Sequence, residues 1–328
     1  MNEKIMTKNE IREHATVEKG EQKTSEGLKK SPFVIVDTAP KGRMPPWLHR
    51  TLPKGSALFQ TKSEIKEKRL HTVCEEAKCP NLTECYSKST ATFLILGKEC
   101  TRACGFCEID FSKTPQAPEE NEPENIAESV FALKLKHVVI TMVARDDLQD
   151  GGATHLVRVL EAVRKQNKGV TCETLTSDFA GNEEALNILL DARPEIFNHN
   201  LETVPRLSPK VRHKATFPRS LRTLELAKKR EGQYVKSGLM LGLGETKDEV
   251  VDTLKKLRDV GCDIVTLGQY LQPSRRKLQV TNYIHPDVFT EYQEIGKSLG
   301  IPYVYAGPFV RSSYNAGVVL NNFIISSH

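Results

Sequence analysis

The chain has 328 residues, of which 38% are hydrophobic and 27% charged, and its formal net charge is +5. These values are typical of a globular protein, and so small an excess of cations is not by itself a nucleic-acid signature. No apolar run approaches the length of a membrane span, and residues 1–30 lack the apolar core of a signal peptide. We therefore expect a cytoplasmic protein with no nucleic-acid partner and no membrane association.

The N-terminal part of the chain divides at about residue 30. Residues 1–30 are rich in Lys, Glu, Thr and Asn and poor in aromatics, so we expect a disordered or loosely ordered arm. Residues 31–90 form an N-terminal extension, which begins with a proline-rich stretch around Trp47. A short helix is predicted from Ser63 to Leu70, directly before the first cysteines.

Residues 91–306 alternate between β and α signals, which predicts βα units and a parallel sheet. The fold class is therefore α/β, and about six such units around one core predict a partial (β/α)6-type barrel, with active-site residues at the carboxyl ends of its strands. The predicted strands are Thr92–Leu96, Val138–Met142, Val170–Leu175, Ile196–Leu201, Val235–Leu241, Ile264–Leu267 and Tyr303–Ala306. The predicted helices are Pro123–Lys136, Ala153–Gln166, Asn182–Leu190, Leu221–Arg230, Lys247–Val260 and Pro286–Leu299.

Residues 307–328 form a C-terminal segment, and its tail, Gly317–His328, is apolar without an evident role.

Six of the eight cysteines form two triplets. In the first, Cys74, Cys79 and Cys85 follow a C-x4-C-x5-C spacing; in the second, Cys100, Cys104 and Cys107 follow C-x3-C-x2-C. Clustered cysteines in a reducing compartment are more often metal ligands than disulfides. A [4Fe–4S] cube usually takes four thiolates, so each triplet leaves one iron open to another ligand. Zinc and a purely structural cluster are the alternatives, but zinc commonly needs a fourth Cys or His close by.

The second triplet has an aromatic residue, Phe106, before its last cysteine and directly follows the first predicted barrel strand. This arrangement resembles the radical S-adenosylmethionine (SAM) superfamily. The resemblance implies that Cys100, Cys104 and Cys107 hold a [4Fe–4S] cluster whose fourth iron binds SAM, which is cleaved to a deoxyadenosyl radical. The cofactor then supplies the difficult chemistry, while the protein supplies orientation and exclusion of water.

Further strings narrow the resemblance to the lipoyl synthase family, from about Pro45 to Ala316. They are PPWL, LPKG, TVCEEAKCPN, CTRACGFC, ARDDLQDGG, NHNLETVPRL, SGLMLGLGET, LGQYLQPS and GPFVRSSY. One departure is Tyr86, where the family usually has tryptophan after the first triplet.

In that family the first triplet and a serine hold a second, auxiliary [4Fe–4S] cluster, which is the sulfur source. The resemblance implies that the ligands here are Cys74, Cys79, Cys85 and Ser313. It therefore also implies that the N-terminal and C-terminal extensions together complete an iron–sulfur site at the barrel. An oxygen ligand is a poorer partner for a thiophilic iron than a thiolate, so it can leave more readily. Taken alone, the Arg311-Ser312-Ser313-Tyr314 string could be an ordinary polar turn.

The implied reaction inserts two sulfur atoms, at C6 and C8 of an octanoyl chain bound to a lysine of a lipoyl carrier protein. The implied partners are octanoylated carrier domains (2-oxoacid dehydrogenase E2 subunits and the glycine-cleavage H protein), a low-potential electron donor and an iron–sulfur assembly or carrier protein. We expect Ser313 and Arg311 to act in catalysis, with Arg311 steering the substrate or orienting the auxiliary cluster; a surface salt bridge is the alternative for Arg311.

The residues expected to contact SAM are Phe106, Arg145, Asp146, Glu173 and Asn200, which follow or lie on predicted strands. A polar βα loop is the alternative for Arg145 and Asp146. Buried acid and amide groups such as Glu173 and Asn200 need partners, and the ammonium or ribose of SAM could serve. His199 is expected to be a satisfied core histidine.

Two other function classes need consideration. A carrier of electrons with two clusters would gain nothing from open irons or from a body the size of a whole barrel. A different radical SAM enzyme, such as a methylthiotransferase, is disfavoured by the separate Ser313.

Overall fold

The computed structural model describes residues 44–50, 53 and 56–326, and all of them belong to one unit that covers Ile35–His328. The arm expected at residues 1–30 lies outside the described residues. No helix among those described is long and apolar enough to cross a membrane.

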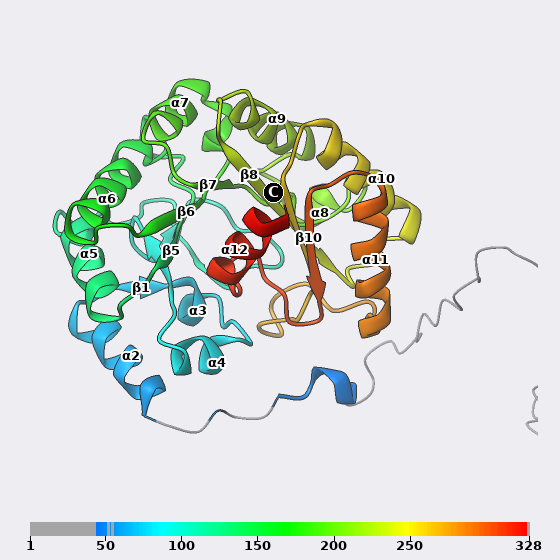
Figure 1. Ribbon diagram of the computed structural model, residues 1–328, viewed down its shortest axis with the longest axis horizontal. Coiled ribbons are helices and arrows are strands. Elements are labelled where there is room, and N and C mark those ends of the chain that lie inside the picture. The colour runs from blue at the N-terminus through cyan, green and yellow to red at the C-terminus, as the bar shows by residue number, and fades with distance from the viewer. Residues whose placement is uncertain (1–43, 51–52, 54–55, 327–328) are drawn as a thin grey trace, which may run out of the picture. The chain divides into compact units, whose positions relative to one another are not determined.

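The main sheet of the described part has eight strands in the order β1-β2-β5-β6-β7-β8-β9-β10. Only β1 is antiparallel to its neighbour, and every later pair is parallel. The strands curve around a common centre in Figure 1, with β1 and β10 as the two ends of the sheet. The strands are β1 His71–Thr72, β2 Thr92–Ile95, β5 His137–Met142, β6 Thr171–Leu175, β7 Ile196–Asn198, β8 Tyr234–Leu241, β9 Ile264–Gln269 and β10 Tyr303–Gly307.

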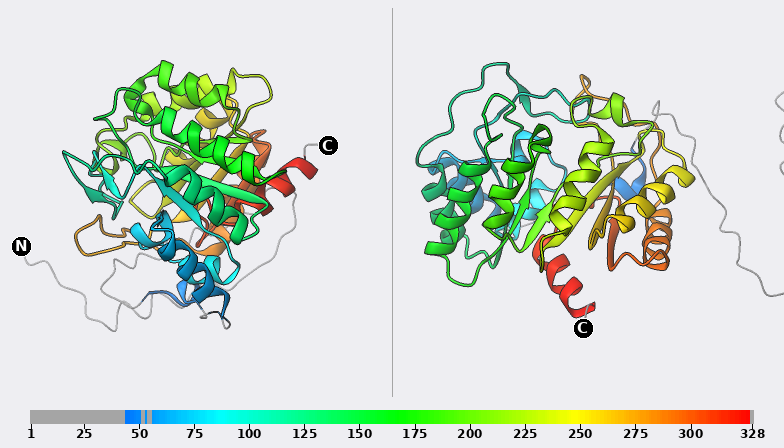
Figure 2. Two further views of the ribbon diagram at one scale, coloured as in Figure 1. Left: turned by 90° about the vertical axis from the view of Figure 1, so that its left-hand side faces the viewer. Right: turned by 90° about the horizontal axis from the view of Figure 1, so that it is seen from above.

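Helices alternate with the parallel strands and lie outside the sheet (Figures 1 and 2). From β2 to β10 the chain makes six βα units and a closing strand, which confirms the predicted partial (β/α)6-type barrel. The outer helices are α5 Glu122–Ala132, α6 Ala153–Gln166, α7 Glu183–Asp191, α9 Phe217–Lys228, α10 Lys247–Asp259 and α11 Pro286–Ser298. The remaining elements are η1 Pro46–Leu48, α2 Ala57–Glu67, α3 Val73–Glu76, α4 Leu82–Ser87, β3 Glu99–Cys100, β4 Asp110–Phe111, η2 Phe179–Gly181, α8 Ser208–Val211 and α12 Ala316–Ser326.

Local chemistry explains the start of α10 and the end of α2. The side chain of Thr246 accepts a hydrogen bond from the Glu249 amide while Glu249 reaches back, and this capping box starts α10. The predicted start of the first helix at Ser63 was wrong, because α2 already begins at Ala57 after Ser56. It ends at Glu67 and not Leu70, since Arg69 takes a positive φ of 54° that no helix continues through.

The apolar tail forms α12, which closes the amino-terminal ends of the strands. Val319, Leu320 and Phe323 are buried against Ile196 and Ile264, the first residues of β7 and β9. Figure 1 shows α12 at the centre of the ring of strands. The tail is therefore apolar because it covers the open base of the barrel core.

The two extensions meet at the gap between the sheet ends. The Asn81 side-chain amide donates to the Phe309 carbonyl at 2.7 Å. The Tyr314 hydroxyl donates to Glu84 Oε1 at 2.9 Å. These bonds join the cysteine-bearing helix α4 and its N-cap residue to the segment after β10.

Candidate metal centre

The first cysteine triplet lies on two short helices and the turn between them. Cys74 is on α3, whose N-terminus is capped by the Thr72 hydroxyl accepting from the Glu75 amide, and Cys85 is on α4. Cys79 follows Lys78, which has a positive φ of 50° and reverses the chain. All three cysteines and Ser313 line one cavity of about 400 Å³.

The thiols in this cavity are free, and burial disfavours the ionisation of two of them. Burial, with repulsion from Cys79, raises the pKa of Cys74 to about 12 and that of Cys85 to about 11. Metal ions bind such groups as thiolates and displace their protons. Arg311 lies close enough to Cys79 for mutual electrostatic influence and would offset part of that negative charge.

Ser313 is brought to the cysteines by a fixed loop. The Arg50 guanidinium stacks over the Phe309 ring, 3.9 Å from its centroid, and pairs with Glu84. At the other side of this loop a Cβ on Gly268 would come within 1.9 Å of the Val310 carbonyl oxygen. Glycine is therefore required in β9 at this point so that the loop can pass over the strand.

The second triplet lies on the loop after β2, and backbone bonds hold that loop to neighbouring segments. The Thr101 amide donates to the Ala144 carbonyl and the Gly105 amide to the Val211 carbonyl, each at 2.9 Å. Burial raises the pKa of Cys104 to about 11 and that of Cys107 to about 12. A metal group bound to these sulfurs would displace the protons. As the described residues stand, no group of three or more Cys, His, Asp or Glu lies close enough together to hold a metal ion.

Arg102 fixes the same loop from within. Its guanidinium is buried and donates to Asp146 Oδ1 at 2.7 Å and to Asp178 Oδ1 at 2.6 Å. Although burial opposes it, the Arg102 charge helps to lower the pKa of Asp178 to about 2. Asp178 also accepts from Arg219 Nε at 2.6 Å, so one carboxylate joins the loop to α9.

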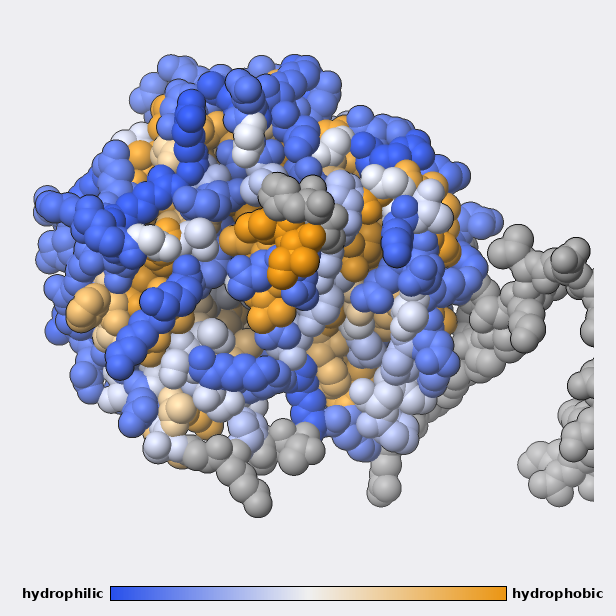
Figure 3. All heavy atoms as spheres, viewed as in Figure 1, coloured by the Kyte–Doolittle hydropathy of each residue, from blue (hydrophilic) through white to orange (hydrophobic). Residues whose placement is uncertain are grey.

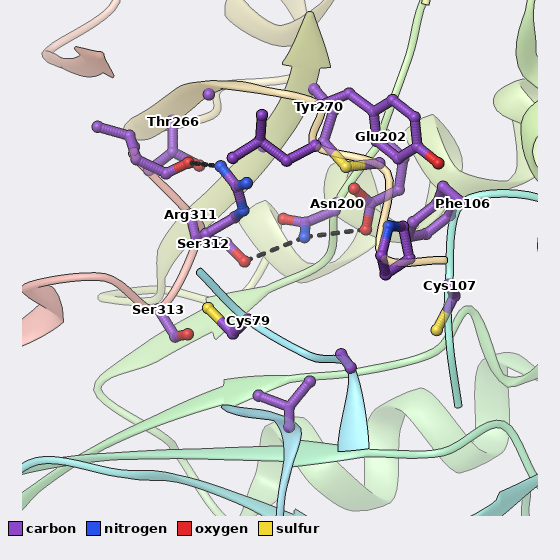
Figure 4. A pocket seen from close by; sticks show the side chains of 18 of the residues that line it. Cys79, Phe106, Cys107, Asn200, Glu202, Thr266, Tyr270, Arg311, Ser312 and Ser313 are labelled. Carbon is purple, nitrogen blue, oxygen red and sulfur yellow. Dashed lines mark hydrogen bonds between the residues drawn. The ribbon is translucent and has the colours of Figure 1, made fainter. Parts of the chain in front are cut away.

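A second cavity, of about 200 Å³, lies between the triplets and has Cys79 and Cys107 on its wall. Figure 4 shows Ser313 beside Cys79 on one side of this space and Phe106 and Cys107 on the other. Much of the remaining wall is apolar, formed by Val73, Ala77, Leu175, Leu239, Met240, Leu271 and Val310. The cavity therefore offers an apolar path from one triplet to the other.

A polar corner of this cavity lies at the carboxyl ends of β7 and β8. Asn200 Nδ2 donates to Glu202 Oε1 at 3.0 Å and to the Ser312 hydroxyl at 3.1 Å, as the dashed lines in Figure 4 mark. Arg212 Nη1 donates to the Asn200 carbonyl at 2.7 Å, while its buried Nε and Nη2 atoms have no partner among the described residues. Burial raises the pKa of Glu202 in spite of this neighbouring cation.

The predicted site residues are not all placed alike. Phe106, Asn200, Arg311 and Ser313 line the cavity between the triplets. Arg145 does not line it, because its guanidinium pairs with Asp147 at 2.8 Å and donates to the Gln116 carbonyl at 3.0 Å.

Asp146 and Glu173 likewise lie off the cavity wall. Asp146 holds Arg102. Glu173 is fully buried inside the barrel, where it pairs with Lys236 Nζ at 2.9 Å and accepts from Asn198 Nδ2 at 2.7 Å. Their contact with SAM, like that of Arg145, stays a prediction.

Two buried arginines of the site were not singled out from the sequence. Arg102 stands between cysteines of the second triplet, and Arg212 follows the NHNLETVPRL string. No periodicity distinguishes a buried arginine from a surface one, so only their position in these strings could have drawn attention to them.

Comparisons with known proteins identify the family of the chain. The family model described as "Radical SAM superfamily" matches residues 94–257, and the one described as "N-terminal domain of lipoyl synthase of Radical_SAM family" matches residues 7–79. A protein named lipoyl synthase from Protochlamydia amoebophila is 62% identical over 282 residues, covering 85% of this chain and 87% of its own. One of the same name from Chlamydia felis is 55% identical over 281 residues, covering 85% and 90%.

Solved structures resemble the chain in fold. The crystal structure of methylornithine synthase (PylB) matches with a TM-score of 0.51 at 13% identity, covering 84% of this chain and 90% of that one. Streptococcus suis SuiB bound to S-adenosylmethionine matches with a TM-score of 0.53 at 12% identity, covering 69% and 54%.

Proposed function

The chain belongs to the lipoyl synthase family of the radical SAM superfamily, and on this premise we propose how its residues divide the work. The protein is a sulfur-inserting radical SAM enzyme that uses [4Fe–4S] clusters and SAM. Its substrate is an octanoyl chain on a lipoyl carrier protein, and its product carries sulfur at C6 and C8.

Each cysteine triplet holds one cluster in this proposal. Cys100, Cys104 and Cys107 hold the cluster that binds SAM, and Cys74, Cys79, Cys85 and Ser313 hold the auxiliary cluster. When bound, these groups supply a radical that removes hydrogen from saturated carbon and the sulfur that replaces it. A saturated C–H bond offers no acidic proton to a general base, so the side chains have other tasks than proton removal.

The observation that carries the proposal is the apolar cavity with a cysteine of each triplet on its wall. Apolar side chains on this wall, those of Leu175, Leu239 and Met240, can pack against an alkyl chain and remove it from water. They also exclude water from the space between the clusters. A chain extended along this wall would have its distal carbons between the source of the radical and the source of sulfur.

Arg311 and Ser313 act at the auxiliary end of the cavity. Ser313 lines both cavities together with Cys79, which supports the proposal that its oxygen is the fourth ligand. The Arg311 guanidinium has no ion pair with a carboxylate among the described residues, and it faces Cys79 and Glu202. Arg311 therefore holds positive charge next to an anionic cluster.

Asn200 and Phe106 are the proposed SAM contacts that lie on the cavity wall. Beside Asn200 on this wall, the Glu202 carboxylate offers an acceptor for the amino group of SAM. The Arg212 cation is not on the wall itself but donates to the Asn200 carbonyl. For Asp146 we propose an indirect role, since it holds Arg102 and so fixes the loop that carries Cys100 and Cys104.

Ser313→Ala tests the ligand role. We expect the anaerobically reconstituted variant to cleave SAM to deoxyadenosine in the presence of an octanoylated peptide, but to insert less than about a tenth of the normal sulfur, because a weakened ligand set loses its cluster. Mass spectrometry of the peptide and liquid chromatography of deoxyadenosine give both quantities. Ser313→Cys, which restores a soft ligand, should keep its full iron content. A normal lipoyl yield in Ser313→Ala would refute the ligand role.

The finer partners remain part of the proposal. The E2 subunits of 2-oxoacid dehydrogenases and the glycine-cleavage H protein would carry the octanoyl chain. A low-potential donor would supply electrons, and an iron–sulfur assembly or carrier protein would restore the consumed cluster. A cytoplasmic location is proposed because clustered thiols need a reducing compartment.

A further inference from the structure

The auxiliary cysteines can be reached from two opposite ends of the barrel. The cavity between the triplets is lined by Leu175, which ends β6, and by Asn200 and Tyr270, which follow β7 and β9. It therefore opens at the carboxyl ends of the strands. Its wall holds only Cys79 of the first triplet.

The cavity that holds all three auxiliary cysteines opens at the amino-terminal ends of the strands. Thr92 and His137, the first residues of β2 and β5, line it together with Gly317 and Val318 of α12. Three residues line both cavities and therefore lie between them: Cys79, Arg311 and Ser313. This second opening is called the rear mouth below.

The rear mouth is positively charged. Lys88, Lys134, Lys136 and Arg311 line it, together with His137, and no Asp or Glu is among its lining residues. Lys88 is neutralised in part by Glu84 at 2.6 Å, but Lys134 and Lys136 are exposed and extend into water. This end of the barrel therefore favours the binding of an anionic partner.

An apolar surface borders the same opening. Val318 lines the mouth and is 57% exposed, and Ile325 of the same helix is 75% exposed. Figure 3 shows the apolar patch over α12 at the centre of this face, with hydrophilic side chains around it. An apolar centre inside a polar, cationic rim is typical of a surface that binds a protein.

We propose that the rear mouth is the docking site for an acidic protein that delivers a [4Fe–4S] cluster to Cys74, Cys79, Cys85 and Ser313. The inference rests on the proposed function, in which sulfur insertion consumes the cluster at these residues. Rebuilding through the rear mouth leaves the carboxyl-end cavity to SAM and the octanoyl chain. A [4Fe–4S] cluster with its thiolate ligands is itself anionic, so both the acidic carrier and the cluster are attracted to the cationic rear mouth.

The transfer is a ligand exchange. After the remaining iron and sulfide have left, Cys74, Cys79, Cys85 and Ser313 each form one bond to an iron of the incoming cluster as one carrier ligand leaves. The protons of the three thiols and the hydroxyl pass to the departing ligands or to water. No electron is gained or lost, so no further reagent is needed.

Lys134→Glu/Lys136→Glu tests the docking surface on the full chain. The enzyme with both clusters first completes one round of sulfur insertion and is then offered a [4Fe–4S]-loaded carrier protein of net negative charge. We expect the variant to match the native enzyme in the first round, and then to regain iron and sulfide about tenfold more slowly at low salt. With equal amounts of ferrous and ferric iron and with sulfide in place of the carrier, which together match the oxidation state of a [4Fe–4S] cluster, both proteins should recover equally, since no docking is needed.

Arg275→Glu/Arg276→Glu is the matched control, because it reverses the same charge on exposed residues of the loop after β9, at the carboxyl end. It should recover iron from the carrier at the native rate. The proposal would be overturned if the native enzyme and Lys134→Glu/Lys136→Glu regained iron and sulfide from the carrier at equal rates. It would also be overturned if only the control variant regained them more slowly. A native enzyme that inserts no sulfur in the first round would instead refute the proposed function.

Discussion

Several buried charges near the centre are each held by a defined partner. Glu173 and Lys236 are fully buried, and Asn198 and Lys236 bind the Glu173 carboxylate. Although burial raises the pKa of Glu173, the Lys236 and His137 interactions outweigh it and the net shift is downward. Such a pair adds little stability as a whole, but each partner depends on the other, because an isolated buried charge is very costly.

Lys236→Met should therefore lower the free energy of unfolding by about 3–5 kcal/mol, since it leaves Glu173 without its cation. Urea unfolding of the reconstituted enzyme, followed by circular dichroism, measures the change. The double variant Lys236→Met/Glu173→Leu should recover most of the loss. A double variant less stable than the single one would show that Glu173 is stabilised chiefly by Asn198 and His137.

At the scale of elements, alternation of strands and helices was sufficient to predict the barrel. Each of the strands predicted between Thr92 and Ala306 overlaps one observed, because strands buried on both faces read as short apolar runs. The ends were less certain: β7 stops at Asn198 and not Leu201, since Glu202 takes a positive φ of 64° close beyond it.

Features that depend on contacts between distant segments could not be predicted in this way. Phe309 meets Asn81 and Arg50 only because both extensions reach the gap in the sheet. The sequence of the apolar tail does not indicate which strands or helices it packs against. Its place at the base of the barrel became evident only from the fold. Family strings, not periodicity, led to Ser313.

Gly268→Ala should affect the auxiliary site alone. The added methyl group would meet the Val310 carbonyl oxygen, so the loop that carries Ser313 must shift. We expect sulfur insertion to fall by about tenfold or more, as misplacement by an ångström can cost a hundredfold. Deoxyadenosine formation should stay near normal; if it falls in parallel, the substitution disturbs the whole barrel.

Phe323→Ala tests the role of α12 as the base of the core. The Phe323 ring is 3% exposed and contacts Tyr234 edge to face with centroids 5.0 Å apart. Its removal should cost about 3 kcal/mol, the lower end for a buried phenylalanine. The unfolding temperature measures this cost. Ile325→Ala, at a 75% exposed position of the same helix, is the matched control and should change it little.

At the scale of the whole molecule, α9 joins the network that holds the second triplet. His199 lies under this network: its ring nitrogens contact the Thr176 carbonyl at 2.8 Å and the Ser220 hydroxyl at 2.9 Å. A carbonyl only accepts, so Nδ1 carries a hydrogen, and in the neutral ring Nε2 accepts from the Ser220 hydroxyl. The ring links the residues after β7 to α9 with both nitrogens in contact, which confirms the expected satisfied core histidine.

The neutrality of His199 makes the whole fold sensitive to acid. Burial, assisted by the Arg212 charge, lowers the pKa of His199 to about 4, whereas an unfolded histidine has a pKa of about 6.5. Between these values the unfolded chain binds a proton that the folded chain does not, so stability falls as pH falls from about 6.5 to about 4, by at most about 1.4 kcal/mol per pH unit. Asp178, with its pKa lowered to about 2, extends the loss below the unfolded value of 3.8.

His199→Asn separates this effect from the acid sensitivity of the clusters. Asparagine keeps a donor for the Thr176 carbonyl but does not titrate, so the variant should be less stable at pH 7 yet lose less stability between pH 6.5 and pH 5. Anaerobic thermal unfolding at several pH values gives the two slopes. Cluster loss affects both proteins alike, so it cancels in the difference. If stability fell with pH equally steeply in the native enzyme and the variant, His199 would take up a proton in the folded state. A charged ring would then link β7 to α9.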